Sequence, residues 1–242
     1  MIVARGVEMI ELAIEAFGNK ATLNPTLVWD DKEAVLIDIG MPGQSEAIRS
    51  AMEAAGVPFE KLSAVILTHQ DLDHIGSLPE ILSQAAGIID VYAHVLDKPY
   101  IEGQQHLMKT DPAKMSKDAW EALPEPARFI YANPPKTEIT QTLADGDVLP
   151  FCGGIQIIFT PGHTPGHISL YLKESKTLVA GDAMISINGV LRGPVQQTTP
   201  DMETATQSLK KFADIEIASV ICYHGGLVNE NVMEQLKELM KK

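Results

Sequence analysis

The sequence predicts an α/β fold, and three observations support this prediction. Short apolar runs typical of buried strands alternate with segments that carry helix start and stop signals. The order of hairpin strands, helix and buried strand occurs once before and once after a proline-rich middle segment. The chain of 242 residues, 45% of them hydrophobic, is long enough for one large domain with a substantial core.

The first half of the chain shows a hairpin, a helix and a buried strand. Two short apolar runs, residues 27–29 and 34–39, flank a polar turn and predict a β-hairpin. A helix is expected over residues 45–55, and a buried strand over 65–67. A capping box at Ser77-Leu78-Pro79-Glu80 should then open a helix that ends near residue 87, followed by a strand at 88–93.

Residues 95–150 differ in texture, because prolines interrupt short polar helical pieces. We therefore predict a single domain over residues 1–242, with a lid-like insertion at about 95–150 that lies over the core. The apolar and aromatic residues of the insertion that could line a substrate pocket are Tyr100, Leu107, Met108, Trp120, Phe129 and Tyr131.

The second half returns to a regular strand pattern. We expect strands at residues 155–159, 168–172, 178–180 and 217–222, with a hairpin turn at 173–176. Thr199-Pro200-Asp201 should cap a helix that runs to about residue 212, and Asn229 should cap a final helix.

The charge balance disfavours some classes of partner. With 32 acidic and 19 basic residues, the formal net charge of −13 argues against nucleic acid and anionic membrane surfaces as the main partner. It says little about a small-molecule substrate, which is the partner we expect. The first 18 residues lack the pattern of a secretory signal, and no apolar run is long enough to span a membrane. Because Cys152 and Cys222 are too few for a disulfide framework, we expect reduced thiols in a cytoplasmic protein, with a homodimer left open.

The most informative segment is Thr68-His69-Gln70-Asp71-Leu72-Asp73-His74, directly after an apolar run. It places four imidazole or carboxylate groups where a buried strand passes into a loop. Burying such groups without a counter-charge is costly, whereas His and carboxylate are good ligands for divalent transition metals. The segment therefore predicts a metal site.

Three further strands end in imidazole or carboxylate groups. The segment 160–167 contains two Pro-Gly pairs, which favour a rigid turn, and each pair is followed directly by a histidine, His163 and His167. Another strand ends in Gly181-Asp182, and a last one is followed by His224-Gly225-Gly226. Four strands that deliver similar ligands at their carboxyl ends indicate one shared site.

In order and spacing, these segments resemble the metallo-β-lactamase-fold hydrolase superfamily over nearly the whole chain. That family carries His-x-His-x-Asp-His, then a single His, a bridging Asp and a final His. The resemblance implies a four-layer αβ/βα sandwich with a dinuclear metal site at one edge. The run Leu36-Ile37-Asp38-Ile39-Gly40 also resembles the family's early strand, whose Asp supports the site without binding metal.

Carried over by position, the resemblance implies two metal positions. His69, Asp71 and His163 would hold the first metal, with Asp71 where the family usually has a second His. The second metal would be held by Asp73, His74 and His224, and Asp182 would bridge the two. We expect zinc first of all, but a carboxylate at position 71 also favours iron or manganese.

The resemblance implies a metal-dependent hydrolase in which a dinuclear-metal-bound hydroxide attacks a small ester, lactone or related substrate. Asp73 and Asp182 would accept or relay the proton as catalytic residues. The alternative is a non-haem iron oxidoreductase of the same fold that works with a separate electron donor, because flavodiiron relatives also carry a carboxylate, Glu, at the place of Asp71.

Other polar residues have less specific interpretations. We expect His167 to support the ligands rather than bind metal, and His94 to be structural. His106 lies in the insertion, where solvent exposure is more common than substrate contact. Cys222 is expected to be an inert buried thiol.

Overall fold

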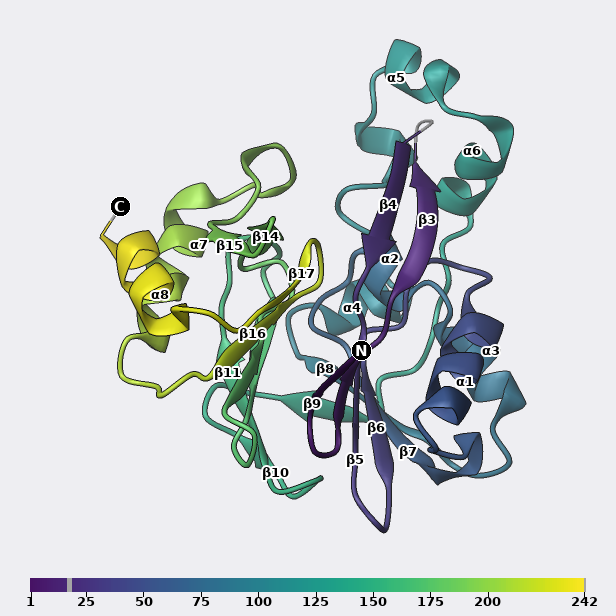
Figure 1. Ribbon diagram of the computed structural model, residues 1–242. Coiled ribbons are helices and arrows are strands. Elements are labelled where there is room, and N and C mark those ends of the chain that lie inside the picture. The colour runs from purple at the N-terminus through teal and green to yellow at the C-terminus, as the bar shows by residue number, and fades with distance from the viewer. Residues whose placement is uncertain (17–18, 242) are drawn as a thin grey trace.

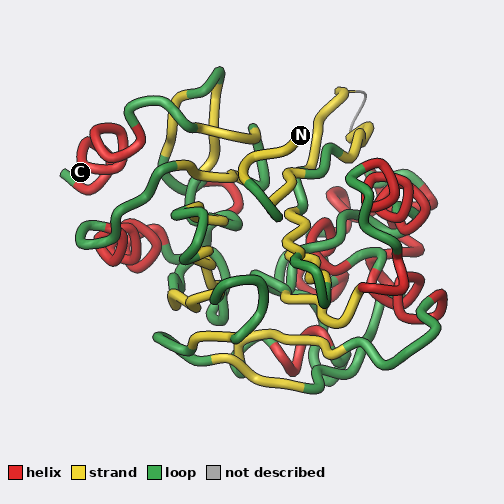
Figure 2. Tube along the Cα trace, turned by 60° about the horizontal axis from the view of Figure 1, so that its bottom comes forward, coloured by secondary structure: helices red, strands yellow, loops and turns green. Residues whose placement is uncertain are grey.

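The computed structural model describes residues 1–16 and 19–241, which fold into four layers (Figure 1). Two β-sheets lie face to face in the middle, and helices cover the outer face of each sheet. A second view shows the helices on two opposite sides of the strands (Figure 2). The α/β fold class and the four-layer αβ/βα sandwich predicted from the sequence are confirmed.

The first sheet has seven strands, and helices α1 (Ser45–Ala54) and α3 (Leu78–Gln84) pack on its outer face. From β6 to β9 its strands run parallel, whereas β1, β2 and β5 join in antiparallel order. In spatial order it contains β1 (Ile2–Ala4), β2 (Val7–Met9), β5 (Thr26–Trp29), β6 (Ala34–Ile37), β7 (Leu62–Ile66), β8 (Asp90–His94) and β9 (Gln141–Leu143).

The second sheet has six strands, and helices α7 (Met202–Ser208) and α8 (Val232–Met240) cover its outer face. Strands β13 and β16 are parallel neighbours, and the other pairs are antiparallel. In spatial order it contains β10 (Val148–Leu149), β11 (Ile155–Phe159), β12 (Ile168–Leu172), β13 (Thr177–Val179), β16 (Ser219–Cys222) and β17 (Gly226–Val228).

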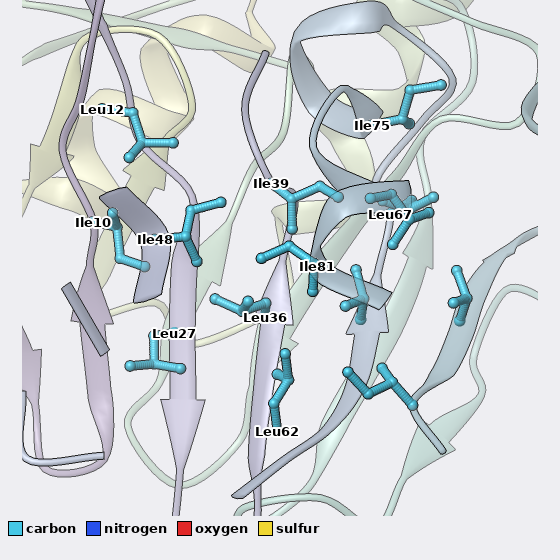
Figure 3. Packing of buried hydrophobic residues seen from close by; sticks show 14 of the residues in the cluster. Ile10, Leu12, Leu27, Leu36, Ile39, Ile48, Leu62, Leu67, Ile75 and Ile81 are labelled. Carbon is cyan, nitrogen blue, oxygen red and sulfur yellow. The ribbon is translucent and has the colours of Figure 1, made fainter. Parts of the chain in front are cut away.

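Strand periodicity divides the apolar side chains between the layers. Val35 and Ile37 of β6 belong to the core between the two sheets, whereas Leu36 points to the outer face. Leu36 packs there with Ile48 of α1 and Ile81 of α3 (Figure 3). Because both faces of the central strands are buried, their sequences are continuous apolar runs rather than alternating ones.

Residues 95–150, which we predict to be a lid-like insertion, contain both helices and strands. Short helices occupy the first part of the segment, and its end supplies β9 to the first sheet and β10 to the second. β9 pairs with β8 and so covers the edge that β8 would otherwise leave open. The helices of the segment are α4 (Lys98–Ile101), the 3-10 turn η2 (Pro112–Lys114), α5 (Lys117–Ala122) and α6 (Glu125–Ala132).

Smaller elements complete the fold. The hairpin of β3 (Leu12–Ala16) and β4 (Asn19–Leu23) extends beside α5 and α6 (Figure 1). A second hairpin pairs β14 (Ile185–Ile187) with β15 (Val190–Arg192). The remaining elements are α2 (Leu72–Ile75) and the 3-10 turns η1 (Phe59–Lys61), η3 (Gln196–Thr198) and η4 (Leu209–Phe212). Within residues 1–16 and 19–241, no helix is long and apolar enough to cross a membrane.

Two helix starts differ from the predicted caps. Ser77 precedes α3 but does not cap it, because its hydroxyl donates to the Met41 carbonyl and accepts from the Gln44 backbone N–H instead. The final helix begins after Asn231, in left-handed conformation, rather than at Asn229. A tertiary contact thus replaces a local cap in the first case.

Candidate metal centre

The predicted ligands lie at one edge of the two sheets, each in a segment that follows a strand. The segment 68–74 follows β7 and includes α2, whereas His163 follows β11. Asp182 follows β13 and His224 follows β16. Because these four strands all run toward the same edge, their carboxyl ends deliver the side chains to one place.

The structure brings all seven predicted metal residues together in two groups. Within each group, the candidate ligand atoms lie within 4.8 Å of one another. The first group contains His69, Asp71, His163 and Asp182, and the second contains Asp73, His74 and His224.

The first group converges on one carboxylate oxygen. Oδ2 of Asp71 lies 3.2 Å from Nε2 of His69 and 3.0 Å from Nε2 of His163. Oδ2 of Asp182 lies 3.2 Å from the same His163 nitrogen. All four residues are buried, so the group lies under the protein surface rather than on it.

The second group is built around the other oxygen of Asp182. Oδ1 of Asp182 lies 3.4 Å from Nε2 of His74 and 3.5 Å from Nε2 of His224. Nε2 of His224 also lies 3.3 Å from Oδ2 of Asp73. One carboxylate therefore faces both groups, with one oxygen toward each.

The donor atoms of this cluster fit divalent cations. Among the buried side-chain atoms of the described residues, Nε2 of His69, Nε2 of His74 and Oδ1 of Asp182 have no hydrogen-bond partner. Such orphaned atoms are costly unless something else binds them. Neutral imidazole and carboxylate oxygen are also the ligands that zinc, iron and manganese accept.

The pKa shifts in the cluster favour positive charge at this site. Burial is the largest influence on the pKa of Asp71 and would raise it, but His69, His163 and Lys109 together hold that pKa well below its usual range. Burial likewise lowers the pKa of His224, yet Asp182 and Asp73 raise it to about 10. Asp71 therefore stays ionised, and the neighbouring carboxylates favour the protonated form of His224.

Comparison with known proteins decides the family. A family model described as the metallo-beta-lactamase superfamily matches residues 22–224, a range that contains every residue of both groups. The chain belongs to the metallo-β-lactamase superfamily. The predicted resemblance is thus confirmed.

Superfamily relatives with assigned names point to hydrolysis. The chain is 35% identical over 221 residues to the "Probable metallo-hydrolase YflN" of Bacillus subtilis, covering 86% of this chain and 81% of that protein. It is 31% identical over 194 residues to the hydroxyacylglutathione hydrolase GloC of Haemophilus influenzae, covering 77% of each chain. A solved structure, the metallo-beta-lactamase family protein TTHA1429 from Thermus thermophilus, matches with a TM-score of 0.73 at 22% identity, covering 99% of this chain and 80% of that one.

Asp38 holds residues of the cluster by hydrogen bonds without belonging to either ligand group, as the family pattern predicts. Its carboxylate accepts hydrogen bonds from the Thr68 backbone N–H and hydroxyl, both at 2.8 Å, and lies 2.8 Å from Nδ1 of His74. His167 supports it from the other side, since its Nε2 accepts from the Asp182 backbone N–H at 2.9 Å. Both contacts fix the orientation of a candidate ligand.

Tyr223 and Asp97 were not predicted as site residues, and no motif marks them. The Tyr223 ring stacks on His74 with centroids 3.8 Å apart, and its hydroxyl donates to the Asp73 carbonyl. Asp97 is fully buried and accepts hydrogen bonds from both ligand loops: from the Gln70 backbone and side chain, from the Thr164 hydroxyl, and from the Gly166 backbone.

Lys109 is the third unpredicted residue. Its ammonium contacts Oδ2 of Asp71 and Nε2 of His163, although the residue lies in the middle segment, far from both in sequence. A lysine in a polar, proline-broken segment has no sequence feature that would have singled it out.

The remaining predicted residues lie outside the cluster. His94 is buried and stacks on Phe159 at a centroid distance of 4.2 Å. His106 is exposed, and Cys222 packs in the core with residues of η4 and α8. None of these three side chains belongs to either ligand group.

A pocket of about 730 Å³ opens over the cluster. The β3–β4 hairpin, the middle segment and residues 195–198 form its walls, and Asp71, Asp73, His163, Asp182 and His224 lie in its lining. Of the residues predicted to line it, Leu107 and Tyr131 do so. Tyr100 instead packs on the outer core of the first sheet, Phe129 is exposed, and Met108 and Trp120 are not among the lining residues.

Gly225 holds the turn that follows His224, and we expect Gly225→Ala to destabilise the fold. Its φ is +99°, and an added Cβ would lie 1.8 Å from the Ser186 carbonyl oxygen. Backbone strain of roughly 1–2 kcal/mol and overpacking of roughly 1–3 kcal/mol should both lower the free energy of unfolding. Gly189→Ala is the matched control, because its φ is +75° but its Cβ would meet open space. Equal urea midpoints for the two variants would contradict this account.

Proposed function

We propose that this protein is a hydrolase that uses two divalent metal ions on a small ester, lactone or thioester. One observation carries the proposal: Asp182 directs one carboxylate oxygen to each of two ligand groups at the floor of a largely apolar pocket. His69, Asp71 and His163 would hold one ion, and Asp73, His74 and His224 the other. All of these come from one chain, so the site needs no second copy.

When bound, the two ions would lower the pKa of a coordinated water toward ~7 and polarise the carbonyl oxygen of the substrate. The protein then has to orient its ligands and move a proton. Asp38 and His167 fix His74 and Asp182, so the reacting groups need little reorganisation. Asp73 and Asp182 both line the pocket and are the carboxylates we assign to accept the proton.

The pocket lining supports an apolar substrate rather than a polyanion. Ile14, Met41, Leu72, Leu107 and Val195 are among its walls. Lys109 is the one lysine or arginine among the lining residues of the described chain. Thioesters join the substrate class because superfamily relatives at 31% and 28% identity are named hydroxyacylglutathione hydrolases.

A second candidate, a non-haem iron oxidoreductase with a separate electron donor, rests on Asp71. A carboxylate in the first group makes that group harder and favours iron or manganese over zinc. Elemental analysis combined with oxygen uptake separates the two functions, because the hydrolase consumes no oxygen.

We expect purified protein to contain close to two transition metals per chain and to hydrolyse at least one member of a panel of short esters, lactones and thioesters. The experiment measures hydrolysis on protein of known metal content, with the exposed-site variant His106→Ala as a control that should match wild type. Two bound metals without hydrolysis of any panel member, together with oxygen uptake from an electron donor, would replace the hydrolase by the oxidoreductase.

A further inference from the structure

The side chain of Lys109 places its positively charged ammonium against the first ligand group. Its ammonium contacts Oδ2 of Asp71 and Nε2 of His163, and its side chain is only 23% exposed. An ammonium can only donate hydrogen bonds, so Nε2 of His163 accepts, and its Nδ1–H is then free to donate to the Thr199 hydroxyl at 3.2 Å. This is the same tautomer that a metal at Nε2 would require.

The Lys109 ammonium and a metal ion at the first ligand group cannot both be bound at the same time. A zinc-like ion bound by Asp71 and His163 would lie about 2.0–2.2 Å from the same two atoms that the ammonium contacts. Two positive charges would then compete for one pair of ligands in a buried setting, where repulsion is strong. Metal binding at this position therefore requires the side chain of Lys109 to move away.

The backbone around Lys109 is anchored, so the movement belongs to the side chain. The Met108 backbone N–H donates to the side-chain oxygen of Gln70 at 3.0 Å, within the ligand loop. Leu107 is buried in the core of the first sheet. Lys109 also lines the pocket, which offers its four-carbon stem a place to turn into.

Among residues 1–16 and 19–241, no lysine or arginine forms an ion pair with the second ligand group. The ion-pair contacts of Asp73 and Asp182 in the described part of the chain are all with histidines. The two groups share Asp182 but differ in the presence of a tethered ammonium. The two groups therefore differ in how easily a metal ion can reach them, and not only in their ligand types.

We infer that Lys109 is a tethered competitor for the first metal position, so that the group of Asp73, His74 and His224 binds metal first and the group of His69, Asp71 and His163 binds metal only when Lys109 is displaced. The inference rests on the proposed dinuclear function and adds an order of loading to it. At limiting metal the protein would then hold one ion per chain with Lys109 still on Asp71.

Zinc titration of metal-free protein against a chromophoric chelator tests this order. Wild type should bind two equivalents with separated affinities. Lys109→Met removes the charge at similar length, and should tighten the weaker equivalent by about tenfold or more, as expected when a competitor holds the position nine-tenths of the time. The stronger equivalent should not change. Lys114→Met is the control, because that exposed lysine lies in the same segment and forms its ion pair with Asp111, outside both ligand groups.

The possible outcomes separate the two proposals. Two equivalents with unchanged affinities in Lys109→Met, in a variant whose circular dichroism and melting match wild type, would overturn the role of Lys109 and leave the dinuclear site intact. If Lys109→Met instead bound the stronger equivalent more tightly, Lys109 would compete at the other metal position, and the inference would be overturned as well. Fewer than two equivalents in both proteins would contradict the dinuclear site and the inference together.

Discussion

Changing Asp182 to alanine should remove metal from both positions and lower hydrolysis by at least about a thousandfold. The reason is geometric, since its two oxygens face different ligand groups, at 3.2 Å from His163 and 3.4 Å from His74. Loss of metal-ion catalysis forfeits several kcal/mol of transition-state stabilisation, and about 4 kcal/mol corresponds to a thousandfold in rate. Elemental analysis and turnover of the same preparation measure both effects.

Two comparison variants make the Asp182 result specific. Asp145→Ala removes an exposed carboxylate that pairs with Lys211, and should leave metal content and turnover unchanged. Asp182→Asn keeps the shape but loses the charge, so it should retain more metal than the alanine variant and less than wild type. If Asp182→Ala kept one full metal at wild-type affinity, Asp182 would serve a single position and the bridge would be wrong.

Much of the fold could be predicted because the local pattern and the tertiary environment agree. The strands at residues 155–159 and 168–172 match β11 and β12, and the hairpin before them matches β5 and β6. Each is a strongly apolar run bounded by turn residues, and each is buried on both faces, so periodicity and burial give the same answer. The N-terminal strands were missed because β1 and β2 have only three residues each, and because a glutamate or a lysine interrupts the apolar pattern of β2, β3 and β4.

The convergence of the seven candidate ligand side chains could be predicted for a similar reason, since their residue types are rare at strand ends and their order is distinctive. Lys109 could not, because its importance depends on how the middle segment packs over the loop of Asp71. Tyr223 and Asp97 are likewise defined by contacts across long sequence separations, 150 residues between Tyr223 and Asp73 and 67 between Asp97 and Thr164. A side chain that acts through packing leaves no periodic or motif signal.

We expect the second large effect from substitution of Asp97. It is fully buried at the junction of the two ligand loops, and all of its partners are donors: Gln70 and Gly166 by backbone N–H, the Gln70 side-chain amide and the Thr164 hydroxyl. A carboxylate suits such a place, because it accepts up to four hydrogen bonds and donates none. The absence of a side chain at Gly166 makes room, since a Cβ there would lie 2.7 Å from Asp97 atoms.

Asp97→Ala should therefore lower the free energy of unfolding by about 3 kcal/mol or more, because two buried backbone donors lose their acceptor at about 1–3 kcal/mol each. The same change should weaken metal binding by about 10–100-fold, the usual cost of losing a group that orients ligands. Asp97→Asn should have an intermediate effect. Its side chain fills the same volume, but its amide N–H₂ would face the hydrogen-bond donors that Asp97 accepts from.

Asp147→Ala is the control, because that carboxylate is exposed and accepts one backbone bond, from Ala144. Urea unfolding and zinc titration of the three variants measure the two effects separately. Loss of stability without loss of zinc affinity would mean that Asp97 only holds the fold; loss of both means that it also keeps the loops of His69 and His163 in register.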